Sequence, residues 1–427
     1  MHQVFLVPGS NEPSDLCGPD GVEAARRLAR ASGRRIEFAH TLRGAACLIV
    51  VFFHLVLFFG GMPQIVARLT GLGHAPPVSR PLRAVAANPL LNFGGMGVAL
   101  FFLISGMVIP LSLGRLDRAS FLIARLFRLV PTYACCLGLT ILGAWAAHVW
   151  FGAPYQIPWR AALAHVALIR DLLSCQPIDG VVWTLEIEAK YYLLCIVFAP
   201  LLRRADVRGI LMWSVAVAVL LVPVGKVPLR WASENAGFCA TVHSLQLSAV
   251  CMSFLWMGTI ICFHHGGRCS TRQTTVAILL LDAAFAAQCL RSGVWGGESL
   301  RMIVSFQLAL AIFVLVYRTP QLVARLPGLN RLADISYSLY VLHGALGYTA
   351  ETVLYELTGS LSLSMAGGIA TMIGLASLVH RFVERPTQTF GKWLSQRWML
   401  RRSRAASAND QPPSSADHNW EPARRAA

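Results

Sequence analysis

Apolar runs of close to twenty residues recur along the chain and are separated by short, arginine-bearing connectors. LMWSVAVAVLLV at 211–222 and FQLALAIFVLVY at 306–317 are two such runs. A helix needs about 20 mostly apolar residues to cross a bilayer. The pattern therefore predicts an all-α, polytopic membrane protein with about ten transmembrane helices in one bundle. We expect the spans at 37–60, 92–113, 126–150, 181–202, 209–224, 243–264, 274–291, 299–317, 332–355 and 361–383.

The arginines predict how these spans are oriented, because connectors on the cytoplasmic side carry an excess of positive charge. If the N-terminus is cytoplasmic, every second connector and the C-terminal segment are rich in arginine, and the outer connectors are poorer in charge for their length. We therefore expect both termini in the cytoplasm. The connectors assigned to this side contain Arg115, Arg118, Arg125, Arg203, Arg204, Arg208, Arg268, Arg272, Arg318, Arg325 and Arg331.

Two connectors fit this assignment less simply. The loop 61–91 is assigned to the outer side although it holds three arginines. Residues 151–180 have an apolar pattern interrupted by charged residues, and counting them as a span would move Arg203 and Arg204 to the outer side. We expect this segment to lie at the outer interface or to form a re-entrant element.

Composition supports the membrane assignment and argues against other classes. Of 427 residues, 55% are hydrophobic and 14% are charged, and the mean hydropathy is +0.56. Soluble domains carry about 25% charged residues. The net charge of +16 does not indicate nucleic-acid binding, since the arginines lie in short connectors and the aromatic residues within apolar runs. The eleven cysteines form no CxxC pair and no zinc-like spacing with histidine, so we expect them to pack between helices and predict no metal site.

The two ends of the chain differ from its centre. Residues 1–35 are polar and do not have the order of a secretory signal peptide. Residues 391–427 are basic and end in a low-complexity stretch. We expect both segments to be tails, largely disordered, around a transmembrane domain at 36–390.

Arg43 and His54 lie within the first predicted span, where charged and polar groups are costly and tend to be functional. They are eleven residues apart, about three helical turns plus 20°, so one helix places them on one face about 16 Å apart. Two interpretations stay open for each residue. Arg43 either extends to the headgroups or has a function, and His54 is either a hydrogen-bonded core histidine or a reactive group. Further polar groups in other spans favour function.

Those further groups occur in four stretches. FGGMGVALFFLISGMVIPLSL at 93–113 contains Ser105 but completes no nucleotide-binding loop. FLIARLFRLVPTY at 121–133 places Arg125 and Arg128 on one helical face, either as ordinary cytoplasmic charges or as an anion site, because guanidinium groups bind phosphate bidentately. VVWTLEIEAKYY at 181–192 holds two glutamates at the end of a span. DISYSLYVLHG at 334–344 carries hydroxyls and an imidazole, and FVERP at 382–386 ends the last span.

Taken together and in this order, these stretches resemble the acyltransferase 3 family of integral-membrane acyltransferases, many of which O-acetylate bacterial surface glycans. The resemblance covers residues 36–386. No single motif is specific to this family, but the occurrence of six motifs in the same order across the spans is specific to it. They are the Arg-x10-His spacing of Arg43 and His54, FFLISG at 101–106, RLFRLVP at 125–131, WTLEIE at 183–188, SYSLYVLH at 336–343 and ERP at 384–386.

The resemblance implies a role for several residues. His54 matches the family's catalytic histidine, Arg43 its essential arginine, and Glu188 its glutamate, while Glu186 is expected to meet water at the end of its span. Arg125 and Arg128 match the family's paired cytoplasmic arginines and, with Arg43, would bind the donor's phosphates. We expect Ser105, Trp183, Ser336, Tyr337 and His343 near the substrate, with Ser105 or Tyr337 as the oxyanion donor. The sequence departs from the family pattern at His40, where an acidic residue is usual, and at Thr184, where serine is usual.

The expected function is membrane-bound O-acyl transfer, in the bacterial cytoplasmic membrane. An acyl group, expected to be acetyl, moves from cytoplasmic acyl-CoA to a hydroxyl of a glycan or glycan-like acceptor. His54 acts either as general base or as acyl carrier. The alternative is a secondary transporter that uses the intramembrane Arg, His and Glu residues as a solute path. Transporters usually have internal repeats, and we find no match between the two halves of the sequence.

Overall fold

The computed structural model describes residues 37–224, 235–324 and 326–409. The predicted N-terminal tail, 1–35, lies outside the described residues, as does the end of the C-terminal one. Within these ranges every regular element is a helix and no strand occurs. The all-α, membrane-spanning class predicted from the apolar pattern is confirmed.

Seven helices among the described residues are long and apolar enough to cross a membrane. They are Glu37–Gly61, α5 (Phe93–Leu113), α6 (Arg118–Phe151), α12 (Ala236–His265), α13 (Thr271–Ser292), α14 (Ser299–Arg318) and the continuous helix Leu361–Arg402. The first contains the π-helical turn η1 (Phe53–Phe58) and ends in α2 (Phe59–Gly61). The last consists of α19 (Leu361–Val379), the π-helical turn η3 (His380–Glu384) and α20 (Arg385–Asn409).

Three of the ten predicted spans have a different form. The region 181–202 is α8 (Val182–Val197) followed by α9 (Ala199–Arg204), with Pro200 in the first turn of α9. The region 209–224 is α10 (Val207–Val224). The region 332–355 is divided into α16 (Pro327–Asp334), α17 (Ser336–Leu342) and α18 (Ala345–Thr358). Each single helix in these three regions is shorter than about 20 residues. Among the described residues, seven of the ten predicted spans are therefore single long apolar helices.

The helix break between α17 and α18 coincides with a backbone contact to the segment that precedes α8. At Gly344 the helix breaks, and a Cβ atom there would lie 2.4 Å from the carbonyl oxygen of Asp179. That oxygen accepts a hydrogen bond from the amide of Ala345 at 3.2 Å. The chain before α8 therefore supplies an acceptor for a backbone donor that the break releases.

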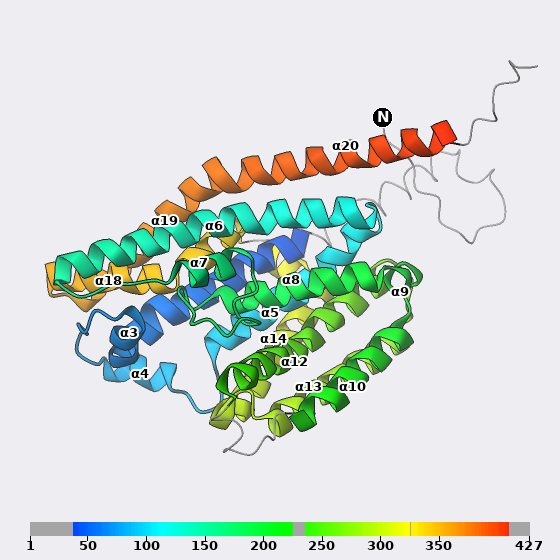
Figure 1. The fold of residues 1–427 in the computed structure, drawn as a ribbon. Helices are drawn as coiled ribbons and strands as arrows, with labels where there is room; N and C mark the ends of the chain where they lie inside the picture. Colours follow the sequence, from blue (N-terminus) through cyan, green and yellow to red (C-terminus); the bar gives the residue numbers. More distant parts are fainter. Residues whose placement is uncertain (1–36, 225–234, 325, 410–427) are drawn as a thin grey trace, which may run out of the picture.

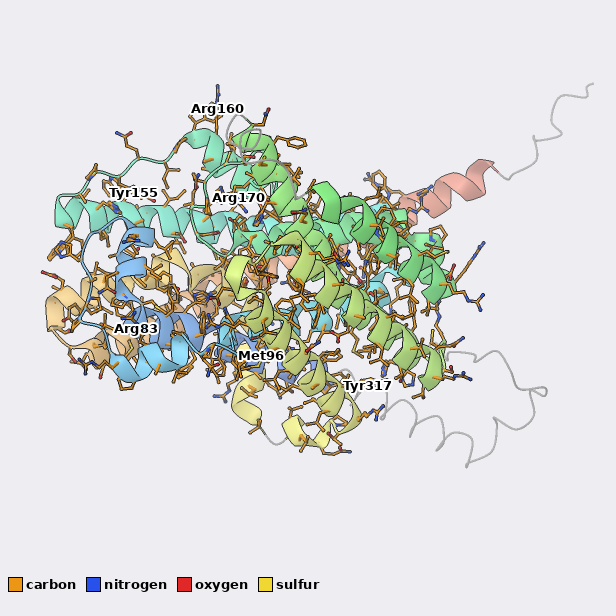
Figure 2. The ribbon with its side chains drawn as sticks, turned by 90° about the horizontal axis from the view of Figure 1, so that it is seen from below. Arg83, Met96, Tyr155, Arg160, Arg170 and Tyr317 are labelled. Carbon is orange, nitrogen blue, oxygen red and sulfur yellow. The ribbon has the colours of Figure 1, made fainter. Side chains whose placement is uncertain are left out.

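Residues 151–180 do not form a span. They contain one eight-residue helix, α7 (Trp159–Val166), which is about 12 Å long, followed by turns. Figure 2 shows Arg160 of this segment at the edge of the molecule and Arg170 closer to the other helices. The side chain of Asp179 caps α8 by accepting from the amides of Val181 and Val182, both at 3.0 Å, and also accepts from the hydroxyl of Tyr133 at 2.7 Å.

The remaining elements are short connectors: α3 (Pro63–Thr70), α4 (Arg80–Ala86), the 3-10 turn η2 (Gly296–Glu298) and α15 (Gln321–Ala324). Around α5, which runs through the centre, α10, α12, α13 and α14 pack on one side, while α6, α18, α19 and α20 form the other (Figure 1). Glycines bring α5 and α12 into direct backbone contact. A Cβ atom on Gly106 would lie 2.0 Å from the carbonyl oxygen of Leu255, as is typical of close-packed membrane helices.

Candidate active site

The helix Glu37–Gly61 and the segment from α16 to α18 lie side by side and run in the same direction. Thr41 bonds Asn330 at 2.7 Å, and the thiol of Cys47 lies 3.7 Å from the carbonyl oxygen of Ser336. Further along, Nδ1 of His54 lies 2.5 Å from the hydroxyl oxygen of Tyr348. Since contacts occur at successive turns of both segments, Arg43 and His54 lie at two levels of one long helix–helix contact.

A narrow cavity opens at the level of Arg43. It measures about 50 Å³, taken as the space open to the centre of a water molecule. Two guanidinium groups and one carboxylate line it together with hydroxyl and apolar groups. The lining residues are Arg43, Val98, Phe101, Phe102, Ser105, Arg128, Leu129, Thr184, Leu185, Glu188, Ser336, Tyr337 and Tyr340.

The three charged side chains that line this cavity come from three different helices, and a fourth helix contributes a carboxylate near it. Arg43 lies within electrostatic range of Arg128 on α6, Glu188 on α8 and Glu384 in η3. Glu188 accepts a 2.6 Å hydrogen bond from the hydroxyl of Tyr192, which lies one helical turn further along α8. Two arginines and two carboxylates thus meet in the interior, where unpaired charges would be costly.

Glu384 is held tightly although the sequence analysis gave it no role. Its Oε2 accepts from Ser338 at 2.7 Å and lies 3.0 Å from Nδ1 of His380, and its Oε1 accepts from Gln388 at 3.0 Å. The carboxylate belongs to the π-helical turn η3, and such turns often occur at functional sites. The ERP motif was the only signal for it in the sequence.

The paired arginines of α6 have different surroundings. Arg128 lines the cavity, but Arg125 is not among the lining residues. The Arg125 guanidinium bonds the hydroxyl of Ser112 and lies 5.3 Å from the ring of Phe121 and 5.4 Å from the ring of Tyr192. Of the two side chains that were expected to act together, only Arg128 therefore lines the cavity, while Arg125 contacts Ser112 and two aromatic rings.

His54 lies outside the cavity lining but is joined to it through aromatic contacts. Its ring centroid is 5.0 Å from that of His343, which in turn is 5.3 Å from the ring of Tyr340, a lining residue. His54 belongs to the π-helical turn η1, just as Glu384 belongs to η3. Tyr348, the hydrogen-bond partner of His54, was not found from the sequence, because it follows the helix break and belongs to no motif.

His343 is fully buried next to His54. Its Nδ1 lies 2.6 Å from the carbonyl oxygen of Tyr340, and because a carbonyl only accepts, this nitrogen carries the proton. The Nε2 atom of His343 is then an acceptor, and it has no hydrogen-bond partner among the described residues. A second imidazole with a free lone pair thus adjoins His54.

The remaining predicted residues divide between the cavity and the surrounding packing. Ser105, Ser336 and Tyr337 line the cavity. However, the hydroxyl of Ser336 donates to the carbonyl oxygen of Ala333 at 2.7 Å, and that of Tyr337 to the carbonyl oxygen of Leu129 at 2.9 Å. Trp183 is not in the lining; its ring faces that of Trp295, with centroids 6.2 Å apart.

The expectation for Glu186 was wrong. This carboxylate is fully buried and does not meet water. It accepts two hydrogen bonds from Arg170, at 2.6 and 3.2 Å, and one from the amide of Asp171 at 2.9 Å. The segment before α8 folds back over the start of that helix, and its charged residues pair there. Lys190, one turn further along the helix, bonds the side chain of Asp171.

Fold and site together define a multi-pass membrane protein with a charged cavity in its interior and a histidine pair beside it. The comparison with protein families places the chain further: the model Acyl_transf_3, described as an acyltransferase domain, matches residues 36–380. The chain belongs to this family and is an acyltransferase, as its six motifs predicted. The comparisons with curated proteins and with solved structures gave no match.

Proposed function

We propose that the chain transfers an acyl group, acetyl in the simplest case, from cytoplasmic acyl-CoA to a hydroxyl of a glycan or glycan-like acceptor. The proposal includes cytoplasmic termini and a place in the bacterial inner membrane. The observation that carries it is the alignment of two arginines at an interior cavity with a hydrogen-bonded histidine further along the same helix contact. This arrangement suits a long, thin donor that is anionic at one end and reactive at the other.

The cavity supports the donor half of this proposal. Coenzyme A ends in phosphates and continues into a narrow pantetheine arm. Arg43 and Arg128 offer guanidinium groups for the anionic end, which such groups bind bidentately. A space of about 50 Å³, open to the centre of a water molecule, is too small for a nucleotide. The nucleotide then stays at the mouth while the arm enters past Tyr337 and Tyr340.

His54 supports the transfer half. One ring nitrogen, Nδ1, is bound to Tyr348, which fixes the orientation of the ring and leaves Nε2 for chemistry. As a general base, Nε2 takes the acceptor hydroxyl proton while that oxygen attacks the thioester carbon. The C–S bond breaks, and the thiolate leaves with the proton from the imidazolium. As an acyl carrier, Nε2 attacks the thioester carbon and the C–S bond breaks, which releases the thiolate. The acceptor hydroxyl then attacks the acyl carbon, the N–C bond to Nε2 breaks, and the hydroxyl proton passes to the thiolate.

The rings of His343 and Tyr340 lie between the cavity and His54, so in this proposal they form the wall along which the thioester moves. Both expected oxyanion donors, Ser105 and Tyr337, line the cavity, and the hydroxyl of Tyr337 is already donated to a backbone carbonyl. On α5 the residue that packs beside His54 is Gly94, against Phe53, and Ser105 lies eleven residues further along, so neither hydroxyl lies at the level of the imidazole. Glu188 would balance the positive charge of Arg43 and Arg128 when the donor is absent.

The test is CoA release by purified protein mixed with acetyl-CoA and a glycan acceptor. His54→Ala should abolish release and acceptor acetylation while the protein still inserts and binds donor. His264→Ala is the matched control, since it removes a partly buried histidine that bonds Tyr317 and Thr271, away from the cavity. Wild-type turnover in His54→Ala would refute the role of the imidazole. Solute uptake by vesicles without CoA release would identify a transporter instead.

A further inference from the structure

The helix Leu361–Arg402 changes character along its exposed face. On α19 the exposed large side chains are apolar, among them Ile373 and Leu378, and Phe382 in η3 is 66% exposed. From Arg381 onward the exposed face becomes cationic, and it stays so through Arg397 and beyond. A change from apolar to basic and aromatic residues is typical of the step from the hydrocarbon core to the headgroup layer.

A shallow, open groove on the exposed face of this helix lies at this change, lined by residues of this helix alone. Arg381, Arg385, Thr389 and Trp393 line it at intervals of four residues, which places them on one face of the helix. Pro386 and Phe390 complete the lining. The groove therefore has two guanidinium groups at one end and two aromatic rings at the other.

Arg381, Arg385 and Trp393 of the groove are exposed, while the ring of Phe390 also contacts that of Phe127 on α6, with centroids 5.3 Å apart. The opposite side of α20 packs on α6, beside which it lies in Figure 1, with Gly391 against the ring of Phe127. Ser395 and Ser120 exchange hydrogen bonds at 2.9 and 3.1 Å. None of the residues that line the groove lines the charged cavity, so the groove is separate from the proposed donor site.

The charge of the groove is not compensated by protein. Arg381 and Arg385 form no ion pair with any of the residues that the structure describes; the guanidinium group of Arg381 lies 5.6 Å from the ring of Phe382. The guanidinium group of Arg397 extends the positive charge over Trp393, 4.4 Å from that ring. Cationic groups beside exposed aromatic rings at a membrane boundary match an anionic lipid headgroup.

We propose that this groove binds an anionic phospholipid, such as phosphatidylglycerol, from the leaflet at the arginine-rich end of the bundle. The headgroup phosphate lies between Arg381 and Arg385, and the rings of Phe390 and Trp393 contact the glycerol and upper acyl chain. This site is independent of the acyl transfer proposed above, because no residue of the groove lines the cavity. The bound lipid fixes the position of the long final helix, and therefore of Glu384, relative to the bilayer.

The test is native mass spectrometry of the full chain titrated with phosphatidylglycerol or phosphatidylcholine in detergent. The wild type should retain phosphatidylglycerol in preference. The double variant Arg381→Gln/Arg385→Gln should bind it about 30-fold more weakly, since each cation near an anionic headgroup is worth about 1 kcal/mol. The matched control is Arg204→Gln/Arg272→Gln, which removes the same charge from two other exposed positions and should retain wild-type binding.

Three outcomes would overturn the proposal. They are equal binding of the two lipids by the wild type, equal loss in the control variant, and no loss in the groove variant. A competition arm separates a lipid site from a site for soluble phosphate. Millimolar glycerol phosphate should leave the bound lipid in place. Release of the lipid by glycerol phosphate would assign the groove to a soluble anion. Thermal unfolding of both double variants without lipid checks that they fold.

Discussion

Removal of the Tyr348 hydroxyl gives the sharpest test of how His54 is positioned. Tyr348→Phe keeps the ring but deletes the only group that the structure places within hydrogen-bond distance of Nδ1, at 2.5 Å. A hydrogen bond to a group that becomes charged is worth about 1.5–3 kcal/mol. If the imidazole becomes charged or acylated during transfer, kcat should fall by about 10- to 150-fold at that energy. The KM for the donor should change little, because Tyr348 does not line the cavity.

The assay is steady-state CoA release at varied acetyl-CoA, with thermal unfolding of each variant measured in parallel. If Tyr348 positions His54, kcat should fall while the donor KM and the unfolding temperature stay at their wild-type values. A merely structural role for Tyr348 predicts a lower unfolding temperature, with the loss of release following the loss of folded protein. Unchanged kcat in Tyr348→Phe, with the protein folded, would refute the positioning role.

The other predictions concern the donor site and the packing around it. Arg128→Gln should raise the donor KM more than it lowers kcat, as measured by CoA release, because it removes phosphate binding in the ground state. Arg170→Met leaves the buried carboxylate that it binds unpaired and should lower stability by about 3–5 kcal/mol, seen as a fall in the thermal unfolding midpoint. Gly106→Ala should destabilise the protein by about 1–3 kcal/mol or more, since the new Cβ would meet the carbonyl oxygen of Leu255. Gly138→Ala is its control, as a Cβ there meets no atom within 4 Å, and should leave the midpoint unchanged or higher.

The sequence was sufficient to predict the helical membrane class, because that class follows from a short-range pattern, and it also marked three charged residues that line the cavity. Apolar length identifies a span without knowledge of its neighbours. Arg43, Arg128 and Glu188 each stood out as charges within or beside apolar runs, and all three line the cavity. Whether these side chains act in transfer stays a prediction that the experiments above address.

The features of the fold and site that the sequence did not reveal depend on contacts between segments that are distant along the chain. The break at Gly344 is set by Asp179, 165 positions earlier in the chain, and hydropathy alone reads the interrupted region as one continuous span. The burial of Glu186 likewise depends on Arg170, which belongs to a segment with no clear helical pattern. Tyr348 became visible as the partner of His54 only once α18 was placed beside the first helix.

The two π-helical turns suggest why His54 and Glu384 are presented as they are. A π-helical turn contains one residue more than an α-helical turn, so it rotates the side chains after it relative to those before it. Along an ideal helix Arg43 and His54 share a face, and η1 begins one residue before His54. The helix Glu37–Gly61 can thus place the side chain of Arg43 near α6 and α8, while the turn η1 of the same helix contacts α18. Glu384, at the end of η3, reaches Ser338 while the neighbouring Arg385 points outward to the lipid-facing groove.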